Sequence, residues 1–375
     1  MARNNAASRV IALEEAFLHP KVMELFPASL QQKYAVIRGR LMDVGPERIR
    51  RMDAAGIDAQ VLSHVEPGVQ FLDDPAVAIK TATEVNDWLG DMVRTYPDRF
   101  AGFATLPMQD PGAAARELER TVATCGFVGA MVNGHTHGRY LDHESFAPLL
   151  ERAQALNVPI YIHPTDPPAQ VSSLYYGDSP SLITGWGWQV ETGTHLLRLI
   201  AAGTFDDFPE LKVIVGHMGE LLPFCFTRVN TALTMGEWLL SAREARADIP
   251  GPRARMQKSF SYYMQHNVYV TTSGVFDLPV FECARACLGV DNLLFSVDDP
   301  FQDNFLAVDF LRSIPLGPED KEKLAHGNAE RILGLGPLGD RKSRGAGLRT
   351  AGKLSAMRAR AKAKVGRALL SFLLK

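Results

Sequence analysis

The sequence predicts an α/β protein, a (β/α)8 TIM-like barrel with a basic C-terminal extension. Eight short runs rich in Val, Ile, Leu and Phe recur along the chain, and segments with helical periodicity separate them. Alternating strands and helices are typical of a parallel sheet, and eight such units favour a closed barrel over an open sheet. The expected strands are Val10–Leu13, Ala59–Ser63, Phe100–Leu106, Val128–Val132, Pro159–Ile162, Lys212–Val215, Val268–Thr272 and Leu293–Val297.

The segments between these strands read as helices. They are Pro46–Ala55, Ala76–Tyr96, Pro111–Thr124, Ser145–Leu156, Thr192–Ala202 and Pro279–Leu288. None of them is opened by a glycine-rich phosphate loop, which disfavours a nucleotide cofactor. The segment Pro164–Ser181, rich in Pro, Ser, Asp and Tyr, follows the fifth strand and is expected to be a long functional loop, either a lid or a pocket wall.

The amino-acid composition indicates the class of protein to which the chain belongs. The 375 residues are 46% apolar and 22% charged, which is typical of a soluble chain with a sizeable core. The four cysteines show neither a CxxC pair nor a secreted-type framework, and Cys283 and Cys287, one helical turn apart, are expected to pack in the core. The N-terminus lacks the apolar stretch of a signal peptide, so we expect a cytoplasmic protein.

Charge divides the chain into two parts. Residues 341–375 contain eleven Lys or Arg and no Asp or Glu, although the net charge of the whole chain is −2. We therefore predict a barrel domain over residues 1–340 and a basic tail over residues 341–375. The preferred interpretation of the tail is a disordered, solubilising extension, because a block of like charges repels itself. The alternative is a cationic amphipathic helix that contacts a membrane surface or a partner. No nucleic-acid partner is expected.

Ionisable residues follow several of the expected strands. Glu14 follows the first strand, His163 the fifth and Asp298 the eighth. A barrel brings the C-terminal ends of its strands to one mouth, so residues far apart in the sequence converge there. One imidazole and two carboxylates suit Zn, Mn, Mg or Fe(II) and leave positions open for water and substrate. We predict a site for one divalent metal ion formed by Glu14, His163 and Asp298.

The sixth strand is followed by a second candidate group, His217 with Glu220. A helix is expected to begin near Gly219, which would place the carboxylate of Glu220 close to the imidazole. Such a partner fixes the tautomer of the ring and favours its protonated form, so His217 is a candidate proton donor or charge-stabilising group. The alternative interpretation is that Glu220 only caps the helix.

The remaining histidines near strand ends are interpreted as structural. A lone histidine after a strand is more often part of hydrogen-bonded structure than a ligand, and this is the favoured interpretation of His64, His135 and His137. His195 lies four residues after Glu191 on an expected helix. This spacing indicates an intrahelical pair or a core histidine.

Five motifs follow one another along the chain: Ile11–Phe17 (IALEEAF), Tyr161–Pro164 (YIHP), Gly216–Glu220 (GHMGE), Thr271–Gly274 (TTSG) and Phe295–Phe301 (FSVDDPF). In this order they resemble the metal-dependent decarboxylase branch of the amidohydrolase superfamily. That branch includes aminocarboxymuconate semialdehyde decarboxylase, gamma-resorcylate decarboxylase and 2,3-dihydroxybenzoate decarboxylase. The resemblance runs from about Val10 to Leu333.

The resemblance implies a (β/α)8 barrel with one divalent metal ion (Zn, Mn or Mg), no organic cofactor, and a homodimer or homotetramer. It also implies that a small aromatic acid is the substrate. Carried over by position, Glu14, His163 and Asp298 match metal ligands, while His217 and Glu220 match a catalytic dyad.

Arg228, Trp188 and Phe301 fall where the members acting on aromatic acids line the substrate pocket. The sequence departs from the family pattern at Ala16. Many members carry a second first-strand ligand there, a histidine, whereas the 2,3-dihydroxybenzoate decarboxylase type is similar to this chain in having alanine. Without that imidazole, a larger share of the metal ligands are hard oxygen atoms. This ligand set makes Mg or Mn more plausible relative to Zn.

The resemblance therefore implies a non-oxidative decarboxylation, and we expect the substrate to be an ortho-hydroxybenzoate. The metal would chelate the phenolic oxygen and the carboxylate, and Asp298 would protonate the ring carbon that loses CO2. Two other interpretations remain open at this point. One is a metal-dependent hydrolase of a lactone or an amide in the same superfamily. The other is a catalytically silent scaffold or membrane-associated protein that uses the basic tail.

Overall fold

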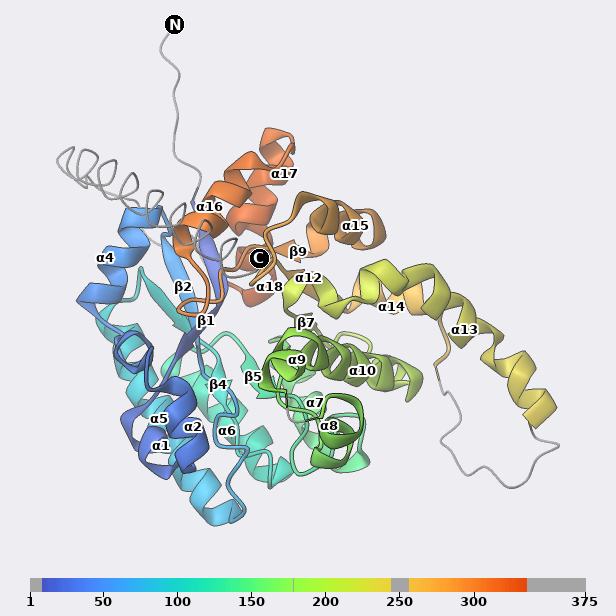
Figure 1. The fold of residues 1–375 in the computed structure, drawn as a ribbon, viewed down its shortest axis with the longest axis horizontal. Coiled ribbons are helices and arrows are strands. Elements are labelled where there is room, and N and C mark those ends of the chain that lie inside the picture. The colour runs from blue at the N-terminus through green and yellow to red at the C-terminus, as the bar shows by residue number, and fades with distance from the viewer. Residues whose placement is uncertain (1–8, 178, 244–255, 336–375) are drawn as a thin grey trace, which may run out of the picture.

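The structure, a computed structural model, describes residues 9–177, 179–243 and 256–335 and confirms the predicted barrel. All strand pairs of the two sheets are parallel, and their orders are β1-β2-β3 and β4-β5-β6-β7-β8-β9. Figure 1 shows the strands at the centre with helices around them. The strands are β1 (Ile11–Phe17), β2 (Ala59–His64), β3 (Phe100–Gly102), β4 (Ala104–Thr105), β5 (Ala130–Asn133), β6 (Ile160–His163), β7 (Val213–Val215), β8 (Val268–Thr271) and β9 (Leu293–Leu294).

One predicted strand, Phe100–Leu106, is divided into β3 and β4 at Phe103. The N–H of Phe103 donates to the carbonyl of Leu62 at 2.9 Å, whereas the N–H of Ala104 donates to the carbonyl of Gly129 at 2.9 Å. The chain thus changes partner from one neighbouring strand to the other within two residues. The two sheets therefore continue into each other, and the ring of the barrel is unbroken at this point.

The helices cover the outside of the barrel. The predicted segments correspond to α4, α5, α6, α7, α10 and α15, with ends that differ by a few residues. The described helices are α1 (Pro20–Leu25), α2 (Ala28–Tyr34), α3 (Arg38–Leu41), α4 (Pro46–Ala55), α5 (Pro75–Thr95), α6 (Pro111–Cys125), η1 (Glu144–Phe146), α7 (Ala147–Ala155), α8 (Ala169–Tyr175), α9 (Pro180–Leu182), η2 (Ile183–Gly187), α10 (Trp188–Ala201), α11 (Thr204–Asp207), α12 (His217–Glu220), α13 (Leu222–Arg243), α14 (Phe260–His266), α15 (Leu278–Leu288), η3 (Val290–Asn292), α16 (Asn304–Ser313), α17 (Pro318–Glu322), η4 (Lys323–Gly327) and α18 (Asn328–Leu333).

The strands are apolar on both faces because both faces are buried. In β7, Ile214 belongs to the cluster that fills the barrel interior, while Val213 and Val215 pack in the cluster beneath the helices. In β6, Tyr161 likewise faces inward between Ile160 and Ile162. This alternation explains the continuous hydrophobic runs of the sequence, which are typical of parallel strands covered by helices.

The sequence places Glu14 just past the first strand, but the structure corrects this: β1 continues to Phe17. Ala12 pairs with Gln60 and Glu15 pairs with Leu62, so the register shifts by one residue between them. Such a bulge reverses the faces that the following side chains occupy. It turns Glu14 into the barrel, where strict alternation from Leu13 would have placed Glu15.

The first and last strands meet without a regular ladder between them in the described residues. They are joined instead by the N–H of Ala16, which donates to the carbonyl of Asp299 at 2.7 Å, and by the N–H of Glu14, which donates to Oγ of Ser296 at 2.7 Å. The closure of the barrel therefore passes through residues of two of the motifs found in the sequence.

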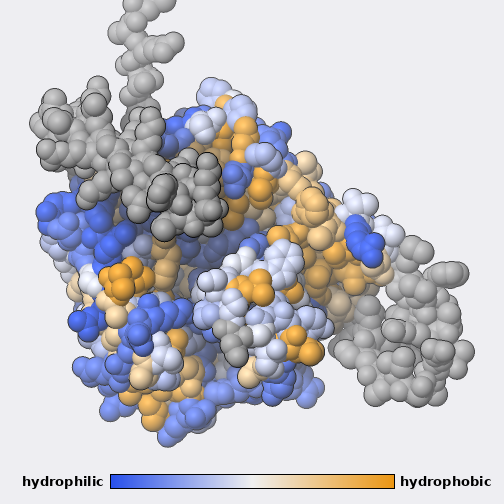
Figure 2. All heavy atoms as spheres, viewed as in Figure 1, coloured by the Kyte–Doolittle hydropathy of each residue, from blue (hydrophilic) through white to orange (hydrophobic). Residues whose placement is uncertain are grey.

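Two segments extend beyond the barrel. The stretch after β6, predicted as a loop, contains the short helices α8 and α9 and carries the exposed side chains of Leu174 and Tyr175. Helix α13 projects from the barrel (Figure 1), and the surface over α13 and α15 is largely hydrophobic (Figure 2), with Phe224 87% exposed. None of the described helices has the length and apolar character needed to cross a membrane. The basic tail and the predicted boundary after residue 340 lie outside the described residues.

Candidate active site

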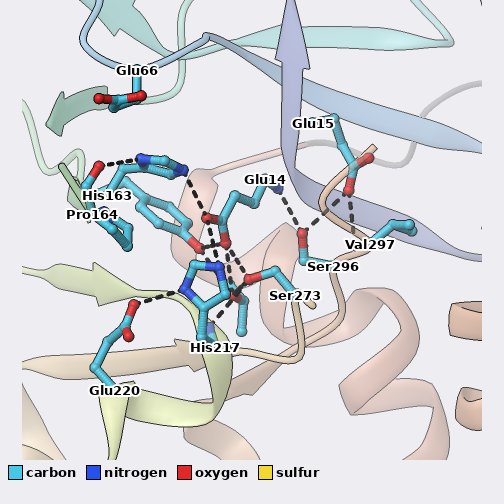
Figure 3. Close-up of polar contacts among 12 residues, drawn as sticks. Glu14, Glu15, Glu66, His163, Pro164, His217, Glu220, Ser273, Ser296 and Val297 are labelled. Carbon is cyan, nitrogen blue, oxygen red and sulfur yellow. Dashed lines mark hydrogen bonds and ion pairs between the residues drawn. The ribbon is translucent and has the colours of Figure 1, made fainter. Parts of the chain in front are cut away.

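Glu14 lies at the centre of the candidate site (Figure 3) and is almost fully buried. Its Oε2 accepts hydrogen bonds from the hydroxyl groups of Tyr161 and Ser273, and Oγ1 of Thr271 lies 3.4 Å away. A side chain on Gly216 would come within 2.8 Å of the same oxygen, which explains the glycine before His217. These contacts fix the carboxylate and leave its other oxygen, Oε1, buried without a hydrogen-bond donor.

The imidazole of His163 faces this second oxygen. Nδ1 of His163 lies 2.8 Å from the carbonyl of Pro164 and must donate to it, because a carbonyl only accepts. Burial lowers the pKa of His163, so the ring is neutral and Nε2 carries a lone pair. Nε2 lies 3.3 Å from Oε1 of Glu14. Two acceptors that face each other in a buried site can both bind one cation placed between them.

This geometry fits a metal ion. An unsatisfied carboxylate oxygen and an imidazole lone pair are two ligands of the kind expected for Zn, Mn or Mg. Asp298 is the third predicted ligand, and its carboxyl group lies near His217, since a side chain on Gly274 would come within 3.2 Å of Cδ2 of His217 and 3.6 Å of Oδ2 of Asp298. Among the described residues, however, no three potential ligands form a complete metal-binding cluster. The role of Asp298 as a ligand therefore stays a prediction.

Tyr161→Phe is expected to weaken metal binding about 10-fold, because the hydroxyl that orients Glu14 through Oε2 is lost while the barrel interior stays filled. The measurement is a metal titration in competition with a chelator. Tyr269→Phe is the matched control, since Tyr269 packs in the same interior cluster. Equal metal affinities for wild type and Tyr161→Phe would show that the hydroxyl does not position Glu14.

His217 lies on an unusual backbone segment. The five residues from His217 to Leu221 all have positive φ angles, of 48°, 56°, 84°, 52° and 67°. The helix expected to begin near Gly219 is α13, which begins at Leu222; α12 before it is a left-handed turn, and only Gly219 adopts this conformation without steric cost. Each of the other four residues costs on the order of 1 kcal/mol. Such strain persists only where the surrounding packing holds it, and it is typical of functional sites.

The turn brings Glu220 back to His217. Nδ1 of His217 lies 2.7 Å from Oε1 of Glu220, and Nε2 lies 3.8 Å from Oε1 of Glu14. Burial disfavours the charged imidazole, but the carboxylates of Glu220, Glu14 and Asp298 outweigh it and raise the pKa of His217 to about 10. The predicted pairing of His217 with Glu220 is present in the structure, although by a route that the sequence did not predict.

Asp298 is buried at the same mouth, on a residue with φ 80°. Burial and the neighbouring charge of Glu14 raise the pKa of Asp298 well above its usual range. The site thus contains a protonated imidazole at neutral pH, beside a carboxyl group whose pKa is raised. Both are positioned for proton transfer.

Glu15 is a site residue that no sequence pattern indicated. Its Oε1 accepts from the N–H of Val297 at 2.9 Å and from Oγ of Ser296 at 3.2 Å, and its Oε2 accepts from the N–H of Asp299 at 3.1 Å. These bonds bracket Asp298 on both sides. Glu15 therefore holds the loop that carries Asp298, and the only sequence signal for this was its place beside Glu14.

Comparison with known proteins places this site in a family. The family model described as Amidohydrolase matches residues 39–335. The chain belongs to the amidohydrolase family. A gamma-resorcylate decarboxylase from Polaromonas sp. (strain JS666) is 37% identical to it over 332 residues, which cover 87% of this chain and 98% of that protein.

Solved structures give the same result. A 2,6-dihydroxybenzoate decarboxylase in complex with 2,6-dihydroxybenzoate matches this amidohydrolase with a TM-score of 0.76 at 36% identity, over 88% of this chain and 100% of that chain. A 5-carboxyvanillate decarboxylase from Novosphingobium aromaticivorans, in complex with manganese and 4-hydroxy-3-methoxy-5-nitrobenzoic acid, matches with a TM-score of 0.79 at 34% identity, over 88% and 97% of the two chains.

Aromatic residues surround the mouth of this amidohydrolase. The ring of Trp188 meets that of His163 edge-on at 6.3 Å, and its Nε1 donates to Oδ1 of Asp166 at 2.7 Å. Phe301 is 43% exposed and lies edge-on to Tyr34 at 6.4 Å. Two of the three predicted substrate-binding residues, Trp188 and Phe301, thus lie on loops and helices at the mouth.

Arg228, the third predicted substrate-binding residue, lies elsewhere in the described structure. It is exposed on α13 and lines a groove with Phe224, Thr231 and Cys287, which is on α15. Its role in substrate binding stays a prediction. Sequence spacing gave no signal of this placement, because the sequence predicted for α13 only a beginning near Gly219.

The other histidines of the amidohydrolase have structural contacts. Nδ1 of His64 lies 2.9 Å from the carbonyl of Val65, and His195, which is fully buried, accepts the N–H of Leu141 through Nε2 at 3.0 Å. His195 is thus a core histidine. Exposed His137 lies 3.2 Å from the carbonyl of Leu72 through Nε2.

His195→Gln is expected to make the protein less sensitive to acid. Burial lowers the pKa of His195 to about 3, whereas the unfolded value is about 6.5. Between these values the unfolded chain binds a proton that the native state does not, so the free energy of unfolding falls as pH falls, by about 2 kcal/mol at pH 5. Urea unfolding of wild type and variant at pH 7 and pH 5 measures the difference. Equal losses in both proteins would contradict this assignment.

Proposed function

We propose that this amidohydrolase decarboxylates a hydroxybenzoate with the help of one divalent metal ion and without an organic cofactor. This chain matches two similar proteins over nearly their whole length, and these proteins are named gamma-resorcylate decarboxylase and 2,6-dihydroxybenzoate decarboxylase. The observation that carries the proposal is the pair of facing acceptors, Oε1 of Glu14 and Nε2 of His163, with the paired His217 and Glu220 beside them.

Glu14, His163 and Asp298 would hold the metal. Their two carboxylates and one imidazole suit manganese, magnesium or zinc, and the similar 5-carboxyvanillate decarboxylase structure contains manganese, so we propose manganese. The bound ion would supply positive charge that attracts the substrate's carboxylate and lowers the pKa of its neighbouring phenol.

Side chains of the protein would deliver the proton that replaces CO2 on the ring. Loss of CO2 from the ring leaves an electron pair on carbon, and one proton must take its place. Asp298 would give this proton from its carboxyl group, whose pKa is raised by burial and by the neighbouring charge of Glu14. His217, held by Glu220, would stabilise the negative charge that develops on the substrate and return a proton to the site after turnover.

The aromatic rim would orient the substrate and limit the access of water. Trp188 lies against His163, and Phe301 ends the turn that begins at Asp298, so a flat ring between them would be held near the metal ligands. A cytoplasmic location and a homodimer or homotetramer accompany this proposal as predictions. Size-exclusion chromatography with light scattering measures the oligomeric state.

CO2 release from 2,6-dihydroxybenzoate tests the proposal, measured with metal-free protein and after addition of manganese, magnesium or zinc. We expect turnover only with metal, and retention of about one ion per chain. Metal-dependent hydrolysis of a lactone or an amide without any CO2 release would contradict decarboxylation. Turnover that does not depend on any metal would contradict the assignment of Glu14 and His163.

A further inference from the structure

In the described part of the chain, Lys33 carries the only ammonium group that contacts the aromatic rings at the mouth of the site, those of Trp188 and Tyr34. It lies on α2, in the long connection between β1 and α4. Its Nζ lies 4.8 Å from the centroid of the Trp188 ring and 5.4 Å from that of the Tyr34 ring. Trp188 is also the ring that meets His163. A single aromatic side chain therefore separates this ammonium group from a predicted metal ligand.

The position of Lys33 is fixed by a buried carboxylate. Its Nζ lies 2.9 Å from Oε2 of Glu66, whose side chain is 4% exposed, while that of Lys33 is 32% exposed. Oε2 of Glu66 also accepts from the hydroxyl of Tyr34 at 2.8 Å, and Oε1 accepts from Oγ1 of Thr165 at 3.3 Å. Glu66 is thus occupied by protein donors on both oxygens, and Figure 3 shows it on the side of His163 away from Glu14.

The ammonium group of Lys33 has N–H donors that Glu66 does not use. An ammonium group has three N–H donors, and the bond to Glu66 uses one. Figure 2 shows the surface hollowed between the part formed by α1 and α2 and the part formed by α8 to α10, and Lys33 and Trp188 come from these two parts. The remaining donors of Lys33 are available to a molecule that enters there.

We propose that Lys33 determines substrate specificity: it donates a hydrogen bond to a second oxygen substituent on the ring, so that dihydroxybenzoates are preferred over monohydroxybenzoates. This inference rests on the proposed function and names a substrate class for it. In the proposed function, the first hydroxyl and the carboxylate of the substrate would lie toward Glu14 and His163, the residues that would hold the metal. A further ring oxygen at the rim would meet a charged donor, and charged donors form the stronger hydrogen bonds. A ring without that oxygen leaves the donor to water.

The test is a substrate panel with the full-length, metal-loaded enzyme. The five acids are salicylate and 2,3-, 2,4-, 2,5- and 2,6-dihydroxybenzoate, and kcat and KM are measured separately for wild type and Lys33→Met. We expect kcat/KM to fall about 10-fold or more for at least one dihydroxybenzoate, mainly through KM. For salicylate it should change less than about 2-fold.

Two further variants show whether the effect belongs to this ammonium group. Lys33→Arg keeps a charged donor and should retain most of the preference. Lys21→Met is the matched control, because Lys21 is a partly exposed lysine on neighbouring α1 that pairs with Glu84, and its loss should change no ratio between substrates.

The outcomes separate the two proposals. An equal fall for all five acids in Lys33→Met would show that Lys33 only balances the charge of Glu66 and would overturn the specificity role. The specificity role would also be overturned if Lys33→Met ranked the five acids by kcat/KM in the same order as wild type. It would likewise be overturned if the wild-type enzyme released CO2 from salicylate and from none of the dihydroxybenzoates. No CO2 from any acid in the metal-loaded wild type would overturn the proposed function itself, and the role of Lys33 with it.

Discussion

Asp298→Asn is expected to fold normally and to lose turnover by a factor of about 1000, within the range that positioned acids and bases contribute. An amide has no proton of suitable acidity to give to carbon, so the step that replaces CO2 on the ring would depend on water. The backbone of Asp298 has φ 80°, and asparagine tolerates this region at least as well as aspartate does. The variant therefore removes the acid without adding backbone strain.

The measurement is single-turnover CO2 release, combined with thermal unfolding and metal content. Asp303→Asn is the matched control, because Asp303 caps α16 through the N–H groups of Phe305 and Leu306, and asparagine also forms such caps. It should leave turnover within about 2-fold of wild type. Near-normal activity of Asp298→Asn would remove Asp298 from the mechanism. Loss of the metal together with activity would assign Asp298 to binding rather than to proton transfer.

Glu220→Gln is expected to lower kcat by about 100-fold at neutral pH and to change the shape of the pH profile. The negative charge of Glu220 is a main reason why the pKa of His217 rises to about 10. Without that charge the pKa of His217 falls, so the protonated ring is lost at a lower pH. The alkaline limb of the kcat profile should therefore move toward neutral pH, by one unit or more.

A second histidine–glutamate pair in the same protein provides the control. Nδ1 of His326 lies 3.1 Å from Oε2 of Glu330, four residues later on the chain and away from the mouth. Glu330→Gln should leave the pH profile of kcat unchanged. A profile that Glu220→Gln also leaves unchanged would show that His217 does not act in its protonated form.

The elements of this fold could be predicted because each one is coded locally. A short apolar run bounded by polar residues indicates a buried strand wherever it occurs, and α4 begins and ends where its sequence predicts, after Gly45 and before Gly56. The candidate ligands were found for the same reason. Strand ends converge in a barrel, so His163 and Glu14 could be paired without knowledge of the intervening chain.

The parts that escaped prediction depend on tertiary packing. The bulge that turns Glu14 inward is a shift of register against β2, and a single strand does not show its register. The left-handed turn contains Met218 and Leu221, which have no preference for positive φ, so local propensity predicts a right-handed helix there. Lys33 is distinctive only through its contact with Trp188, a residue far from it in the sequence.

The contacts that close the barrel between its first and last strands limit how this sequence can diverge. Glu15 joins the two ends of the ring by accepting N–H groups on both sides of Asp298, at a place where the strands themselves form no ladder in the described residues. A descendant that abandoned the chemistry would still need this carboxylate to keep its barrel shut. Persistence of Glu15 among distant descendants is therefore weak evidence of activity, whereas persistence of His217 and Glu220, which do not close the ring, is strong evidence.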